Sequence, residues 1–113
     1  MTLVDTSVWI GHFRHADPVL ERLLNDGEVA VHPMVLGELA CGNLPNRSNT
    51  LHLLGQLPLV PQVPDGIVLD AIDSRHLWAK GIGWIDAHLL VASIVSGTPL
   101  WTLDRRLAEL APL

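Results

Sequence analysis

Hydrophobic and polar positions along the chain predict short strands that alternate with helices. Apolar strands are expected at 2–4, 28–32, 59–63 and 100–103. Helices are expected from a cap at Thr6 or Ser7 through Phe13, and then at 18–25, 35–41, 50–57, 65–80, 85–95 and 105–110. Such alternation favours an α/β domain whose mostly parallel central sheet has helices on both faces.

Proline and glycine mark several of these boundaries. Asp17-Pro18 is a typical helix start, because proline suits the first helical position, and Gly27 follows the expected end of that helix. The stretch 85–95 is apolar around nearly its whole circumference, which predicts a buried helix that ends before Gly97.

Length and composition indicate a single domain over residues 1–113. No apolar stretch reaches membrane length and the start resembles no signal peptide, so we expect a cytoplasmic protein with no membrane contact. Hydrophobic residues make up 49% of the chain, which suggests that some apolar surface is kept for partners. Cys41 is the single cysteine, so no internal disulfide is possible, and we expect it to be buried.

Four acids stand beside hydrophobic residues, in the fragments LVD, VLGEL, WID and WTLD. They are Asp5, Glu38, Asp86 and Asp104, and each is expected near the end of a strand or the start of a helix. Each alone has a structural explanation, since three suit helix starts and Glu38 could pair with an arginine. Together they predict one shared site beyond the carboxyl ends of parallel strands.

A cluster of carboxylates requires compensating positive charge. Two carboxylates ~4 Å apart repel by about 4 kcal/mol at an effective dielectric near 20. A proton or a divalent cation must relieve that repulsion. Oxygen ligands favour Mg²⁺ or Mn²⁺, and no His/Cys spacing indicates zinc.

A cation held by carboxylates suits phosphodiester hydrolysis, with one of the outer acids orienting the attacking water. No G-x-S-x-G motif and no glycine-rich phosphate loop offers a competing chemistry. The net charge of −5 argues against a nucleic-acid partner, but the four candidate acids account for most of it.

The fragments LVDTSVWI, VLGELACG, GIGWIDAHLLVAS and LWTLDRRL together resemble PIN-domain ribonucleases, and most of all the VapC-type toxins of toxin–antitoxin pairs. The resemblance implies a PIN fold, Mg²⁺- or Mn²⁺-dependent endoribonuclease activity, a homodimer and a cognate antitoxin. It implies that Asp5 and Asp86 are the principal metal ligands, with Asp104 as a further ligand and Glu38 as the remaining catalytic acid. By the same resemblance, Thr6 and Thr102 carry hydroxyls that support these acids.

The sequence departs from the family pattern just after Asp104. Related proteins often have another acid there, whereas this chain has Arg105 and Arg106. Two guanidinium groups at this place are candidates for binding the RNA backbone, and a solvated helix start is the alternative explanation. Trp84, two residues from Asp86, is a candidate for stacking on a base, with a place in the core as its alternative.

Two other functions remain as alternatives. A receiver-like signalling domain shares the length, the parallel sheet and an acid after the first strand. Receiver domains share a pair of adjacent acids after the first strand, whereas in this chain Asp5 is followed by Thr6 and Ser7. A non-catalytic PIN-like partner-binding domain should have lost one or more of the site acids, and all four are present.

Overall fold

A three-stranded parallel sheet lies at the centre of the computed structural model, which describes residues 1–111. The strands are β1 (Thr2–Val4), β2 (Val29–Ala30) and β3 (Leu100–Trp101), in the order β2-β1-β3. Leu3 of β1 is paired with Ala30 on one side and Leu100 on the other. The expected strands at 28–32 and 100–103 are therefore shorter than predicted, but the expected parallel sheet is present.

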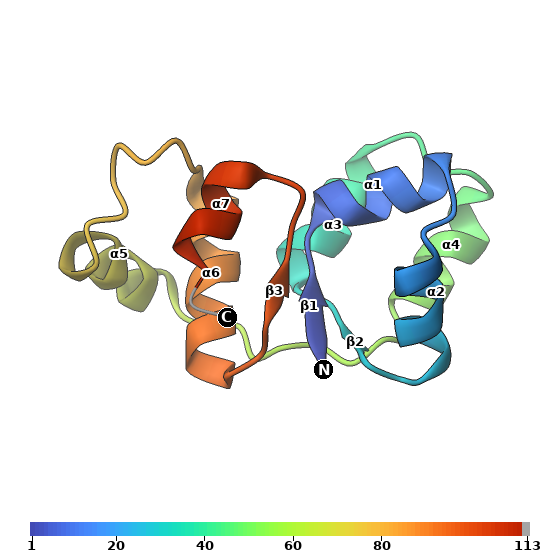
Figure 1. Ribbon diagram of the computed structural model, residues 1–113, viewed down its shortest axis with the longest axis horizontal. Coiled ribbons are helices and arrows are strands. Elements are labelled where there is room, and N and C mark those ends of the chain that lie inside the picture. Colours follow the sequence, from blue (N-terminus) through green and yellow to red (C-terminus); the bar gives the residue numbers. More distant parts are fainter. Residues whose placement is uncertain (112–113) are drawn as a thin grey trace.

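Helices flank the sheet on two sides, with α1 to α4 on one side in Figure 1 and α5 to α7 on the other. Their bounds are α1 (Thr6–Arg14), α2 (Pro18–Asn25), α3 (Pro33–Cys41), α4 (Arg47–Leu54), α5 (Asp65–Ser74), α6 (Trp84–Ser96) and α7 (Arg105–Leu110). This arrangement confirms the α/β class. The predicted domain boundary at residue 113 lies outside the described residues.

Helix starts follow the local chemistry. Asp17 caps α2 by accepting hydrogen bonds from the backbone N–H groups of Val19 and Leu20. The prediction that Thr6 or Ser7 caps α1 was wrong, because Asp5 occupies the N-cap position and Thr6 is already helical. This difference leaves the hydroxyls of both residues available for the acids near them.

Two expected elements of the middle region differ from the structure. The strand expected at 59–63 is reduced to one isolated bridge between Val31 and Leu59, since Pro61 has no N–H to donate to a ladder. The helix expected at 65–80 ends at Ser74, and His76 and Ala79 beyond it have φ angles of 55° and 59°. Left-handed backbone of this kind cannot continue a right-handed helix.

The main core lies between the sheet and α1, α3 and α6, with Leu3, Trp9 and Leu89 fully enclosed. The prediction of a buried α6 is confirmed, because every residue from 87 to 93 is buried. The prediction of a buried Cys41 was wrong: it is the last residue of α3, off the buried face formed by Val35 and Leu39, and it is exposed.

Parallel strands bring the residues that follow β1 and β3 to one edge of the sheet, where α1 and α7 begin (Figure 1). Helix α6 also starts at this edge. Among residues 1–111, no helix has the length and apolar character needed to cross a bilayer.

Candidate active site

Asp5 is a buried carboxylate directly after β1, with only 6% of its surface exposed. Its Oδ2 accepts two hydrogen bonds from hydroxyls, one from Ser7 Oγ and one from Thr102 Oγ1, both at 2.7 Å. Hydrogen bonds of this kind offset the cost of burying a carboxylate and fix its orientation.

The two hydroxyls are themselves held in place by backbone groups of the β3–α7 connection. The N–H of Leu103 donates to Ser7 Oγ, and the N–H of Asp104 donates to Thr102 Oγ1, both at 3.0 Å. Since each hydroxyl oxygen accepts from the backbone, its own proton is directed at Asp5. These hydrogen bonds therefore connect the residues that follow β3 to those that follow β1.

Asp86 lies in the first turn of α6 and is partly buried. Its Oδ2 accepts a hydrogen bond from the N–H of Gly83, the N-cap residue, at 3.2 Å. Burial raises the pKa of Asp86, and the Gly83 hydrogen bond partly opposes this. The negative charges of Asp5 and Asp104 raise the pKa further, so both carboxylates act electrostatically on Asp86.

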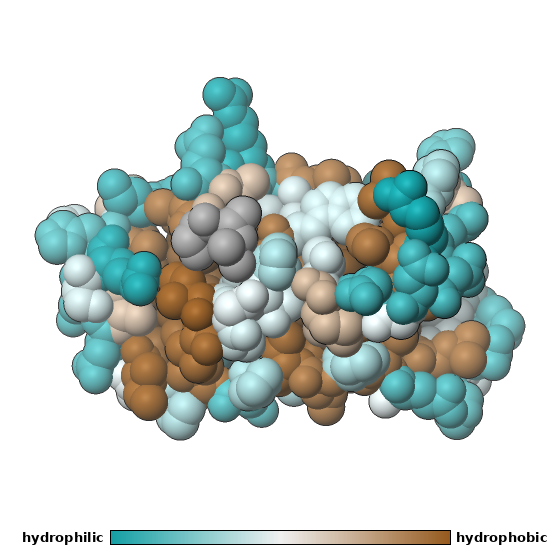
Figure 2. Space-filling model, turned by 60° about the horizontal axis from the view of Figure 1, so that its bottom comes forward, coloured by the Kyte–Doolittle hydropathy of each residue, from teal (hydrophilic) through white to brown (hydrophobic). Residues whose placement is uncertain are grey.

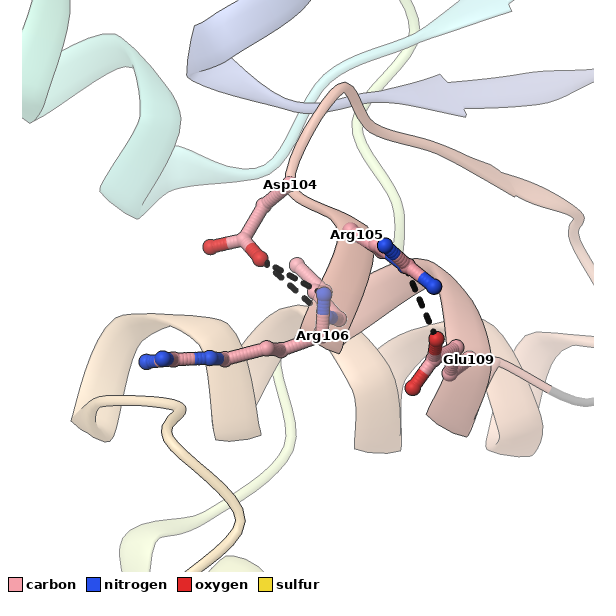
Figure 3. A network of polar contacts seen from close by, with 5 residues as sticks. Asp104, Arg105, Arg106 and Glu109 are labelled. Atoms are coloured by element: carbon pink, nitrogen blue, oxygen red, sulfur yellow. Dashed lines mark hydrogen bonds and ion pairs between the residues drawn. The ribbon is translucent and has the colours of Figure 1, made fainter.

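Asp104 is the exposed N-cap of α7. Its Oδ1 accepts from the backbone N–H groups of Arg106 at 2.9 Å and Leu107 at 3.3 Å (Figure 3). The structural explanation that Asp104 suits a helix start is therefore correct. It does not exclude a role in the site, since one oxygen makes the cap and the charge still acts on Asp86.

Glu38 stands somewhat apart from the three aspartates. It is exposed on α3, and its Oε1 accepts a hydrogen bond from Thr6 Oγ1 at 2.7 Å. It is absent from the charges that raise the pKa of Asp86. The link through Thr6, the residue after Asp5, still places it at the border of the site.

A surface hollow of about 590 Å³ adjoins Glu38, between α1 and α3. Its lining combines apolar side chains with Arg14 and Glu38, and includes Ile10, Phe13, Leu39 and Leu44. The hollow thus joins an apolar surface to one of the candidate acids.

The carboxylates fit a divalent cation by their chemistry. Among residues 1–111, no three His, Cys, Asp or Glu side chains are grouped tightly enough to hold an ion as they stand. Asp5, Asp86 and Asp104 nevertheless supply only hard oxygen donors, and the repulsion that raises the pKa of Asp86 is what a bound cation would relieve.

Sequence reasoning missed the role of Ser7, which it took for a helix cap. The hydrogen bonds of Thr6 to Glu38 and Thr102 to Asp5 agree with the supporting roles expected for these two threonines. The spacing of Asp5 and Ser7 was the available signal, because a hydroxyl two residues after an N-cap carboxylate can reach back to it.

Comparison with known proteins agrees with these features. A family model described as PIN domain matches residues 2–113. The chain is 47% identical over 108 residues to Ribonuclease VapC32 of two Mycobacterium tuberculosis strains, CDC 1551 / Oshkosh and ATCC 25618 / H37Rv. The match covers 95% of this chain and 87% of each relative. The chain therefore belongs to the PIN-domain family and, within it, to the VapC-type ribonucleases.

Proposed function

We propose that this protein is a metal-dependent endoribonuclease, the toxin of a type II toxin–antitoxin pair, and that Asp5, Asp86 and Asp104 hold its cation. The observation that carries the proposal is that Asp5 and Asp104 are both hydrogen-bonded to Thr102 Oγ1 at the carboxyl edge of a parallel sheet, with Asp86 near enough to feel their charges. The identity to Ribonuclease VapC32 supports the activity.

Mg²⁺ or Mn²⁺ is the cation that suits this donor set, since all three ligands are carboxylate oxygens. Bound there, the ion supplies positive charge to the phosphate and lowers the pKa of water. Ser7 and Thr102 keep Asp5 oriented for this task. Groups that hydrogen-bond to a metal ligand in this way commonly affect the affinity of the site for its metal.

Glu38 is the proposed general base. Thr6 Oγ1 donates to its Oε1, which leaves Oε2 to accept a proton from the attacking water. Because Glu38 is exposed and does not add to the repulsion on Asp86, it is separate enough from the ligands for this different role.

The alternatives that the sequence left open are not favoured. Membership of the PIN family argues against a receiver-like signalling domain. A non-catalytic PIN-like binding domain would have no need for all four acids, or for the hydroxyls that orient two of them.

The hollow between α1 and α3 suits the cognate antitoxin. We propose that the antitoxin lays apolar side chains against Phe13 and Leu44 and brings an arginine or lysine to Glu38. Such a cation would pair with the proposed general base and inhibit the enzyme.

We also propose a homodimer that acts in the cytoplasm. Large apolar side chains are exposed, and Val95 near the end of α6 has 62% of its surface exposed. Figure 2 shows hydrophobic surface on the left of the view, in the part of the molecule where α5 and α6 lie in Figure 1. Apolar surface of this kind is typical of contacts between subunits.

An RNA cleavage assay tests the proposed function. The purified protein should cut a single-stranded RNA in Mg²⁺ or Mn²⁺ and stop in EDTA. Asp5→Asn should abolish cutting, whereas the matched surface change Asp26→Asn should not, since Asp26 is exposed at the end of α2. Full cleavage in EDTA, or by Asp5→Asn, would contradict the proposal.

A further inference from the structure

The connection between α5 and α6, residues 75–83, has an unusual backbone for its length. His76, Ala79 and Gly81 all have positive φ angles, of 55°, 59° and 81°. The rings of His76 and Trp78 stack with centroids 6.4 Å apart. Left-handed backbone at residues other than glycine costs free energy and is often found at functional sites.

A small hollow of about 180 Å³ lies beside this 75–83 segment. Its walls are apolar and include Leu77, Trp78, Ile82, Trp84 and Ala87. The two tryptophans remain accessible, since Trp78 has 61% and Trp84 has 41% of its surface exposed. Exposed indole rings beside an apolar hollow are suited to stacking on a flat ring.

The hollow adjoins the candidate active site. Gly83 lines it and also donates its backbone N–H to Asp86 Oδ2. An occupant of the hollow would therefore contact a residue that is hydrogen-bonded to Asp86, one of the proposed metal ligands. Figure 1 shows the 75–83 segment leading from α5 to the start of α6, close to α7.

Arg106 brings positive charge to the same segment. A Cβ built on Gly81 would lie 2.5 Å from Arg106 Cδ and 2.8 Å from its Nη1, so the arginine lies directly against the glycine backbone. Within residues 1–111, no carboxylate forms an ion pair with it, whereas Arg105 pairs with Glu109 at 3.3 Å. Figure 3 shows the two arginines extending in different directions.

We propose that the 75–83 segment and Arg106 form an RNA-binding subsite, in which an unpaired base stacks in the hollow against Trp78 and Trp84 and Arg106 contacts a backbone phosphate. The inference rests on the proposed function and names how its substrate is held. Aromatic platforms beside cationic side chains are the usual way in which proteins bind single-stranded nucleic acid.

Charge favours RNA over an apolar partner as the occupant. Arg75 and Lys80 belong to the segment and Arg106 lies on it, so three of the chain's seven lysines and arginines gather there. A polyanion that approaches Asp5, Asp86 and Asp104 needs such cations at the border of the site. A purely apolar partner has no use for them.

Equilibrium binding in an Asp5→Asn background, where RNA is not cut, tests the subsite. The probe is a fluorescein-labelled single-stranded RNA of mixed sequence, followed by anisotropy in Mg²⁺. Trp78→Ala should weaken binding by at least about fivefold, from the usual worth of one stacked base. Trp78→Phe, which keeps a ring, should retain most of the affinity.

Arg106→Ala and Arg105→Ala form a matched pair, with the same change of charge at adjacent positions. Arg106→Ala should reduce the slope of log Kd against log salt by about 0.7, the value for one phosphate contact on a single strand. Arg105→Ala should change the slope less, because Arg105 is already paired with Glu109. Leu53→Ala, on α4 at the other end of the molecule, controls for loss of an exposed apolar side chain (Figure 1).

The outcomes separate this inference from the proposed function. If the wild type cuts RNA but Trp78→Ala and Arg106→Ala bind like their controls, the subsite is wrong and the function stands. If Trp78→Ala instead lowers the sedimentation coefficient without changing RNA binding, the hollow is a contact between copies and the subsite is again wrong. If the wild type neither binds nor cuts RNA, the subsite and the proposed function are both wrong.

Discussion

Thr102 Oγ1 donates a hydrogen bond to Asp5 Oδ2 across 97 positions of sequence, at 2.7 Å. The two residues follow neighbouring parallel strands, β3 and β1. The N–H of Asp104 donates to the same hydroxyl oxygen, so one threonine side chain connects two of the candidate site acids. This contact makes Thr102 the most direct point at which to disturb the site without removing a carboxylate.

We expect Thr102→Val to lower kcat/KM for RNA cleavage by about 10- to 100-fold, as loss of a partner that orients a metal ligand usually does. Valine keeps the shape and removes the donor to Asp5. Thr102→Ser keeps the hydroxyl and should recover most of the activity. If Thr102→Val is as active as Thr102→Ser at every Mg²⁺ concentration, Asp5 does not depend on this hydrogen bond.

Asp86→Asn should abolish cleavage and yet stabilise the protein in EDTA. Burial and two negative neighbours raise the pKa of Asp86, so its charged form disfavours folding at neutral pH. The amide oxygen of asparagine can still accept from Gly83, and the lost interaction with the helix dipole costs only about 0.3–1 kcal/mol.

Thermal melts in EDTA and in saturating Mg²⁺ measure this effect. A cation that binds only the folded protein adds about 2.7 kcal/mol at 100 times its dissociation constant, so the wild type should gain more Tm from Mg²⁺ than the variant. A variant that melts below the wild type in EDTA and responds equally to Mg²⁺ would show that Asp86 is only a helix-start acid.

His32 should make stability depend on acidity. It is fully buried as the N-cap of α3, its Nδ1 accepts from the N–H of Met34, and the His88 ring lies 6.1 Å away. Burial, and then His88, lower the pKa of His32 below its ordinary value of 6.5. The unfolded chain therefore binds this proton first, and stability falls as the pH drops below 6.5, by at most about 1.4 kcal/mol per pH unit.

Urea unfolding of the wild type and His32→Asn between pH 7.5 and 5.5, in EDTA, tests this dependence. Asparagine is a good N-cap and can accept from Met34, but it does not titrate. The variant should be less stable at pH 7.5 because it leaves a cavity, and the difference should shrink as the pH falls. Parallel pH profiles would mean that His32 takes no part.

Local signals predicted the parts of the fold that depend on local chemistry. Asp17-Pro18 and the Gly27 region bound α2 as expected, and the apolar circumference of 85–95 predicted the burial of α6. The end of α5 was not predicted correctly. The apolar spacing continues to Trp78 and suggested a helix that reaches residue 80, whereas the backbone turns left-handed at His76.

The candidate site was predictable only in part for a related reason. The four acids could be selected by their apolar neighbours, and each lies shortly after a strand or on a helix that begins near the carboxyl edge of the sheet. The contact between Thr102 and Asp5 depends on the register of β1 against β3, which no local pattern contains. The place of Arg106 against Gly81 likewise depends on how two connections meet in space.

The central claim is that Asp5, Asp86 and Asp104 hold one divalent cation, and Mn²⁺ binding followed by electron paramagnetic resonance tests it most directly. The readout is independent of RNA and of catalysis. We expect the wild type and Asp26→Asn to bind Mn²⁺ alike, and Asp5→Asn and Asp86→Asn to bind it at least about tenfold more weakly. Equal Mn²⁺ affinity in the wild type and both site variants would contradict the account.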